Sequence, residues 1–262
     1  MSNKKVLVLD VVKESFDYLL KHFSLMKYYW VGVLLPLAAV HHWSGGIIDS
    51  TIGVVVGVVI VLTLALTVAL IRSVMGQVEM SWSAIIKQFS VGNLWRYLGV
   101  LIQVSLLMFQ LVAIPAFVAF ANYHVILFEQ YDNYIFNNLL MVLGAVVTVL
   151  YSVIMYCVAT VAVINAAGGR RHSIYEGFQM IKGSFVRFFG GLLVTAIPAL
   201  VLFYVMMIFY ASIYVANTGD GYAGIVAISS GVAYLVVCFF QVYFGLLTTI
   251  FATKYYMALR KK

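Results

Sequence analysis

Four basic residues near the middle of the chain are its best candidates for binding chemistry. They lie within residues 168–191, GGRRHSIYEGFQMIKGSFVRFFGG, and are Arg170, Arg171, Lys182 and Arg187. A lysine or arginine close to a membrane surface attracts anionic lipid headgroups with about 1 kcal/mol each. The four residues are therefore candidate contacts for an anionic phospholipid. The alternative is that they only orient the chain in a membrane.

The segment that carries these cations has the pattern of an amphipathic helix. Two glycines, Gly168 and Gly169, suit the end of a preceding helix, and Ser173 with Glu176 fits a capping box. Apolar residues then recur at steps of three and four, which places them on one helix face, at Ile174, Phe178, Ile181 and Phe185. We expect this helix to lie in the membrane interface, with its apolar side among acyl chains. Packing against loops of the same protein is the alternative.

Two other segments repeat this pattern more loosely, at residues 10–30 and 81–99. The apolar face of the first is formed by Val8, Leu9, Val12, Phe16, Leu19, Leu20 and Phe23. The apolar face of the second is formed by Trp82, Ile85, Ile86 and Phe89. We expect both to be amphipathic helices at the membrane surface. For the first, a cytosolic helix that covers the bundle is the alternative.

The composition of the chain indicates a membrane protein. Of the 262 residues, 64% are hydrophobic and only 10% are charged, whereas average globular chains have about 45–50% and 25%. Six windows contain no Asp, Glu, Lys or Arg, and each can hold the roughly 20 residues of a bilayer-spanning helix. They are residues 28–48, 50–71, 97–128, 133–169, 188–219 and 221–253. We therefore predict an all-α integral membrane protein with six transmembrane helices.

The distribution of charge predicts how these helices are oriented. All 16 Lys and Arg fall in the N-terminal segment, in residues 72–96, in residues 170–187 or after residue 253. The three remaining loops contain no Lys or Arg, and their only charged residues are Asp49, Glu129, Asp132 and Asp220. By the positive-inside rule, both termini are cytoplasmic. The same rule accounts for the net charge of +7, so nucleic-acid binding is not predicted.

The crossings pair into three units, each an amphipathic helix followed by a helical hairpin. A proline occurs in the first crossing of every hairpin, where we expect kinks, at Pro36, Pro115 and Pro198. The second crossing contains Gly53 and Gly57, a spacing that permits close helix approach in lipid. The three units form one transmembrane domain, residues 1–262.

Few residues offer catalytic or metal-binding chemistry. The adjacent His41 and His42 fit a metal poorly, because ligand pairs on a helix normally stand three or four residues apart. The polar residues of the apolar windows are expected to form hydrogen bonds between helices, and include Gln103, Gln110, Asn165 and Gln241. Cys157 and Cys238 are expected to be buried thiols. We predict no catalytic residue, no cofactor site and no metal site, and hence no enzyme.

Residues 173–191, with the run Lys-Gly-x-Phe-x-Arg-Phe-Phe-Gly-Gly, resemble a cytoplasmic segment of a bacterial family. The family comprises YciC-like inner-membrane proteins and the membrane domain fused to some glycerophosphodiester phosphodiesterases. A tryptophan often found in that segment is absent here, where Met180 and Ile181 occupy the region. The resemblance implies six crossings in the inner membrane. It implies no enzyme, because the phosphodiesterase chemistry resides in a soluble domain that this sequence lacks.

These observations predict a multi-pass inner-membrane protein without catalysis that acts on lipid or on partner membrane proteins. The alternative is a small-solute transporter or channel that uses the proline-kinked helices. A polar, water-filled path between the helices would indicate the alternative, whereas a lipid-filled groove under the interfacial helices would indicate the first function. Because no Asp, Glu, Lys or Arg lies within the apolar windows, transport driven by protons or sodium ions is not predicted.

Overall fold

The structure is a computed structural model that describes residues 8–36, 50–90, 92, 94–106, 109, 134–169, 174–216 and 223–260. Every regular element in these ranges is helical, which confirms the all-α class. In chain order the elements are α1 (Val8–Lys21), a 3₁₀ turn (Phe23–Leu25), α2 (Met26–Tyr29), a π-helical turn (Trp30–Leu34), α4 (Ser50–Val74), α5 (Trp82–Ser90), the helix Leu94–Leu106, α7 (Tyr134–Ala167), α8 (Ile174–Ile181), α9 (Phe185–Ala216) and α10 (Ala223–Arg260).

Two of the described helices are long and apolar enough to cross a membrane, Gly53–Val74 of α4 and Val142–Ala167 of α7. A third is obtained if α8 and the segment Phe185–Pro198 count as one span, although the two helices meet at a bend of 96°. The described residues therefore support two or three spanning helices, not the predicted six. One reason for the smaller number is that a span needs an unbroken apolar helix, and α8 and α9 are separated by this bend. Another is that five of the six predicted windows, all except 50–71, extend into residues outside the described ranges, and most of all 28–48 and 97–128.

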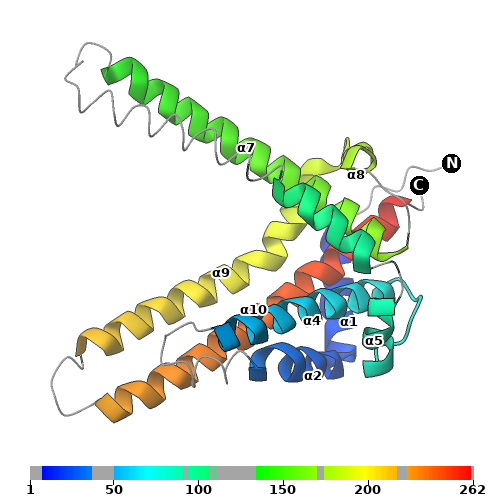
Figure 1. The fold of residues 1–262 in the computed structure, drawn as a ribbon. Coiled ribbons are helices and arrows are strands. Elements are labelled where there is room, and N and C mark those ends of the chain that lie inside the picture. The colour runs from blue at the N-terminus through cyan, green and yellow to red at the C-terminus, as the bar shows by residue number, and fades with distance from the viewer. Residues whose placement is uncertain are drawn as a thin grey trace.

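The three amphipathic helices lie at one end of the molecule, near the described ends of the chain (Figure 1). Helix α1 packs against α9 and α10, α5 packs against α4, and α8 packs against α7. The long helices extend away from this end, with α9 and α10 side by side and α7 in a different direction (Figure 1). The order of one amphipathic helix followed by apolar helices thus recurs in the described chain, as the predicted repeat requires.

The core lies where these helices meet and is rich in aromatic rings. The Phe188 ring of α9 lies 6.3 Å from the Phe251 ring and 5.3 Å from the Tyr255 ring of α10, measured between centroids. All three side chains are fully buried. Aromatic pairs at such distances add to the stability that burial of their area supplies. This cluster joins α9 to α10 at the amphipathic end of the molecule.

Close helix approach occurs at glycines other than the predicted pair. A Cβ at Gly191 of α9 would collide with the ring of Phe251, and a Cβ at Gly177 of α8 would lie 2.8 Å from a carbonyl oxygen of α7. Gly53 and Gly57 instead meet no atom within 4 Å among the described residues. Close approach at these two positions therefore stays a prediction, because the described residues supply no neighbour to either glycine.

The predicted proline kinks can be followed at two positions. Pro198 lies inside α9, and Pro36 lies two residues after the end of the π-helical turn. Proline lacks an N–H, and its ring clashes with the carbonyl four residues earlier, so a widened turn before it is expected. Pro115 lies outside the described residues.

Candidate lipid-binding site

The bend between α8 and α9 positions two of the four predicted cations. Helix α8 ends at Ile181, and α9 begins at Phe185. Between them Gly183 takes a φ of +84°, which glycine adopts without a Cβ clash. The Ser184 N–H donates to the Ile181 carbonyl at 2.8 Å and closes the turn. The resulting bend of 96° turns α8 away from the axis of α9.

Lys182 and Arg187 flank this bend, and both are exposed. Lys182 directly follows α8, and Arg187 lies in the first turn of α9. Arg170 and Arg171, which precede α8 in the chain, lie outside the described residues. The structure thus brings two of the four candidate residues to one exposed bend. The proposed contact of all four with lipid stays a prediction.

Arg187 also acts on a buried tyrosine of α10. Burial raises the pKa of Tyr255, while a hydrogen bond with Ser184 and the positive charge of Arg187 lower it. The bend is therefore electrostatically connected to the end of α10. Nearly 70 residues separate the partners, so no local periodicity in the sequence reports this contact.

Each amphipathic helix divides its apolar stripe between the bundle and the outer surface. The buried members include Leu19 of α1, Ile85 of α5 and Ile181 of α8. The exposed members include Leu20, Ile86 and Phe178, at 61%, 64% and 44% exposure. The inner residue anchors the helix on the protein, and the outer residue presents apolar surface of the kind that interfacial helices bury in a bilayer. The packing of α1 on α9 and α10 confirms that this helix covers the bundle, whereas the contact of its outer face with a membrane stays a prediction.

Three other cations join elements at the amphipathic end of the molecule. Arg72 at the end of α4 donates to the side-chain oxygen of Gln88 on α5 at 3.0 Å. Arg96 donates to the carbonyl of Gly169, just beyond α7, at 2.8 Å. Lys254 of α10 donates to a backbone carbonyl of α1 at 3.0 Å. From the sequence, these residues were expected only to orient the chain in the membrane. In the structure they also form hydrogen bonds that join helices.

Asn165 confirms the prediction that polar residues of the apolar windows bond neighbouring helices. This side chain is fully buried near the end of α7. Its Oδ1 accepts a hydrogen bond from the Tyr256 hydroxyl of α10. Its Nδ2 donates to the sulfur of Met180 on α8 at 3.8 Å. One asparagine therefore connects three helices.

The remaining polar residues form no metal-binding cluster in the described part of the chain. Gln103 is exposed on the helix Leu94–Leu106, and Cys157 is a buried free thiol, as predicted. No group of His, Cys, Asp and Glu that suits a metal ion occurs among the described residues. The other predictions fall on residues or side chains outside them, namely His41, His42, Gln110, Cys238 and Gln241.

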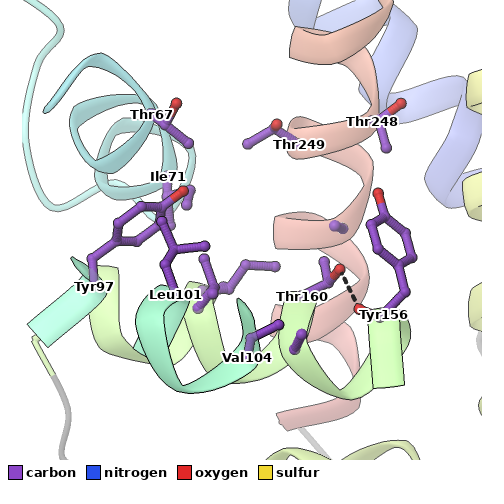
Figure 2. A pocket seen from close by; sticks show the side chains of 13 residues that line it. Thr67, Ile71, Tyr97, Leu101, Val104, Tyr156, Thr160, Thr248 and Thr249 are labelled. Atoms are coloured by element: carbon purple, nitrogen blue, oxygen red, sulfur yellow. Dashed lines mark hydrogen bonds between the residues drawn. The ribbon is translucent and has the colours of Figure 1, made fainter. Parts of the chain in front are cut away.

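A cavity of about 250 Å³, which the sequence analysis missed, opens between α4, α7, α10 and the helix Leu94–Leu106 (Figure 2). Its lining is mostly apolar and includes Leu101, Val104 and Ala252. The sequence contained one weak signal, a set of threonines within otherwise aliphatic windows. Periodicity assigns residues to helix faces, but it does not say which four helices converge.

No protein-family model, no curated protein and no solved structure matches this chain. The resemblance of residues 173–191 to the YciC-like family accordingly stays a prediction. The candidate site is defined by three structural features, which are the exposed bend with Lys182 and Arg187, the divided apolar stripes and the apolar cavity.

Proposed function

We propose that this chain is a non-catalytic, multi-pass protein of the inner membrane that binds anionic phospholipid at the cytoplasmic surface. In this proposal three helix–hairpin units cross the membrane six times, with α9 and α10, 32 and 38 residues long, as the third hairpin. The amphipathic helices lie in the cytoplasmic interface, and both termini are cytoplasmic. The partners are membrane lipids and, through the same exposed surfaces, other membrane proteins.

The observation that carries this proposal is the combination of exposed apolar side chains and exposed cations at the bend between α8 and α9. Phe178, four residues before Lys182, is 44% exposed, and Val186, directly before Arg187, is 79% exposed. Cations there contribute about 1 kcal/mol each near an anionic surface, and apolar burial contributes about 25 cal/mol per Å². Neither contribution alone gives stable binding, so the side-by-side placement supports lipid as the ligand.

Two sequence features support the membrane and its orientation. The complete segregation of Lys and Arg places the amphipathic helices on the cytoplasmic side. The resemblance to YciC-like proteins supports the inner membrane as the location. A described contact is consistent with this arrangement, because Lys254 near the end of α10 donates to the backbone of α1. The two ends of the described chain therefore share one side.

Native mass spectrometry of the purified protein tests lipid binding. Lys182→Gln with Arg187→Gln removes the two described cations of the bend, and Arg170→Gln with Arg171→Gln removes the other pair. Loss of two cations at about 1 kcal/mol each weakens binding roughly 30-fold. We therefore expect each double variant to lose co-purifying phosphatidylglycerol while it still inserts in the membrane.

The matched control removes the same charge from another helix. Lys13 and Lys21 are exposed residues of α1, and Lys13→Gln with Lys21→Gln should leave most of the bound phosphatidylglycerol in place. An equal loss in this control would show that only total charge matters. Unchanged lipid in both test variants would exclude the proposed site.

The alternative, a small-solute transporter or channel, requires a polar path through the spanning helices. The cavity among the spanning helices has a mostly apolar lining. A more polar hollow of about 590 Å³ lies between the end of α1 and the connection from α4 to α5, at the amphipathic end of the molecule. The polar hollow thus does not run between the long helices, and the cavity that does is mostly apolar, so both observations favour lipid as the ligand over a solute path. Gradient-dependent uptake of a solute into reconstituted vesicles would favour the transporter instead.

A further inference from the structure

We propose that the cavity between α4, α7, α10 and the helix Leu94–Leu106 holds one acyl chain of a phospholipid, with the headgroup at the basic end of the bundle. This inference deepens the proposed function and rests on it for the orientation of the chain in the membrane. It gives the bound lipid a defined position inside the protein. The basic surface alone would attract only a mobile layer of headgroups.

The size and shape of the cavity suit a chain rather than a whole lipid. Four helices from distant parts of the sequence line it, and Thr67 of α4 and Thr249 of α10 project toward each other across it (Figure 2). Its volume of about 250 Å³ lies below the roughly 300–1,000 Å³ of sites that enclose a complete drug-sized ligand. The cavity is partly open, so the rest of a lipid molecule can stay in the bilayer.

Six hydroxyl groups line the cavity, those of Tyr97 and Tyr156 and those of four threonines, and the threonine hydroxyls are already bonded within their own helices. Four threonines donate their protons to the carbonyl four residues earlier in their own helices, at 2.7–2.9 Å, and they are Thr67, Thr160, Thr248 and Thr249. Figure 2 shows one of these bonds, from Thr160 to Tyr156. A buried water needs two to four polar partners, and an apolar cavity stays dry. Because these donors are used within the helices, hydrocarbon is the favoured occupant.

Charge complementarity at the basic end indicates a phospholipid rather than an uncharged hydrocarbon. Tyr97 lines the cavity and directly follows Arg96, which is exposed. One N–H of Arg96 donates to the Gly169 carbonyl, but a guanidinium carries five N–H donors and binds phosphate well. Gly169 directly precedes Arg170 and Arg171 in the chain. A chain in the cavity therefore places its phosphate near Arg96.

Photolabelling of the full-length protein tests this inference. The protein is reconstituted in phosphatidylglycerol vesicles that contain a small fraction of phosphatidylglycerol with a diazirine near the end of one acyl chain. After irradiation, the labelled residues are located by digestion and mass spectrometry. We expect label to concentrate at cavity residues such as Leu101 and Val163, above the level at Val147, an exposed residue of α7. Even labelling along α7 overturns the proposal.

Variants that fill the cavity provide the second test. Ala159→Phe introduces a ring from α7, where Ala159 lines the cavity and is 7% exposed. Thr249→Phe introduces a ring from a half-buried position on α10, in case the first variant does not fold. Val147→Phe, on the outer surface of α7, is the matched control. Both filling variants should lose the cavity label and keep the label near Val147. A folded filling variant that retains cavity label overturns the proposal.

The headgroup is tested with the same photoreactive chain carried by phosphatidylcholine. Phosphatidylglycerol should label the cavity more strongly, and equal labelling by the two lipids overturns the role given to Arg96. If the proposed function fails, the experiments give a different result. In that case the Lys182→Gln, Arg187→Gln variant keeps its bound anionic lipid while the cavity is still labelled. If only the cavity proposal fails, the bound lipid still responds to those variants and the labelling is even.

Discussion

At the scale of single residues, Asn165 is the polar group on which the packing of three helices depends. It is fully buried, accepts from the Tyr256 hydroxyl and donates to the sulfur of Met180. A buried amide without partners is costly, especially where lipid surrounds the bundle. The role of Asn165 is therefore structural, and no residue bound to it in the described chain suggests a reaction.

The first prediction concerns this asparagine. Asn165→Ala should lower the free energy of unfolding by about 1–3 kcal/mol, because the Tyr256 hydroxyl loses an acceptor and a small cavity opens. Gln103→Ala, at an exposed position, should change it by no more than about 0.5 kcal/mol. Denaturant titration of the detergent-purified protein measures both values. Similar stabilities for the two variants would contradict the assigned role.

At the scale of elements, the hairpin of α9 and α10 depends on one glycine. Gly191 lies under the Phe251 ring, whereas its neighbour Gly190 meets no atom within 4 Å among the described residues. The aromatic cluster of Phe188, Phe251 and Tyr255 closes over this contact. Small residues let helix backbones approach closely in a membrane, where packing rather than hydrophobic burial drives association.

Paired substitutions at these glycines test the contact. Gly191→Ala should cost about 1–3 kcal/mol of stability, because the added methyl group forces the Phe251 ring to move. Gly190→Ala should instead be neutral or gain up to about 1 kcal/mol, since alanine restricts the unfolded chain. The midpoint of thermal unfolding in one detergent compares the two variants. A loss of stability at Gly190 equal to that at Gly191 would mean that the contact is not the cause.

At the scale of the whole molecule, the amphipathic helices share one end with three basic residues of the described chain. Arg72, Arg96 and Lys254 connect elements there, and the long helices extend away from it (Figure 1). The described residues support two or three spanning helices. The proposal of six crossings therefore needs a direct test of which loops face outward.

Cysteine accessibility provides that test. In a background with both native cysteines replaced, single cysteines are introduced at Ser50, Asn133 and Thr218, and at Ser2 as the cytoplasmic control. An impermeant thiol reagent added to intact cells should label the first three positions and not the fourth, because the basic segments stay inside. Labelling at Ser2 with protection of the other three would reverse the orientation. Labelling of only some of the three would reduce the number of crossings.

Local properties of the sequence were sufficient to predict the class of this protein and its surface helices. Composition alone indicates a membrane protein, because 64% hydrophobic residues exceed what a soluble fold can bury. The three-and-four-residue spacing of Ile174, Phe178 and Ile181 predicts helix α8, which the structure contains. These signals are readable because helix periodicity and charge segregation involve neighbours in the chain.

Only the tertiary structure decided which surfaces meet. It buries Ile181 and exposes Phe178 of one apolar stripe. It also packs the Phe251 ring against Gly191, whereas Gly53 meets no described atom within 4 Å. It also assembles the cavity, with Thr67 and Thr249 on helices that are far apart in the sequence. In a membrane most faces of a spanning helix are apolar whether they contact lipid or protein. Hydropathy therefore cannot distinguish the packed face from the lipid-facing one, and shape complementarity between distant segments makes the choice.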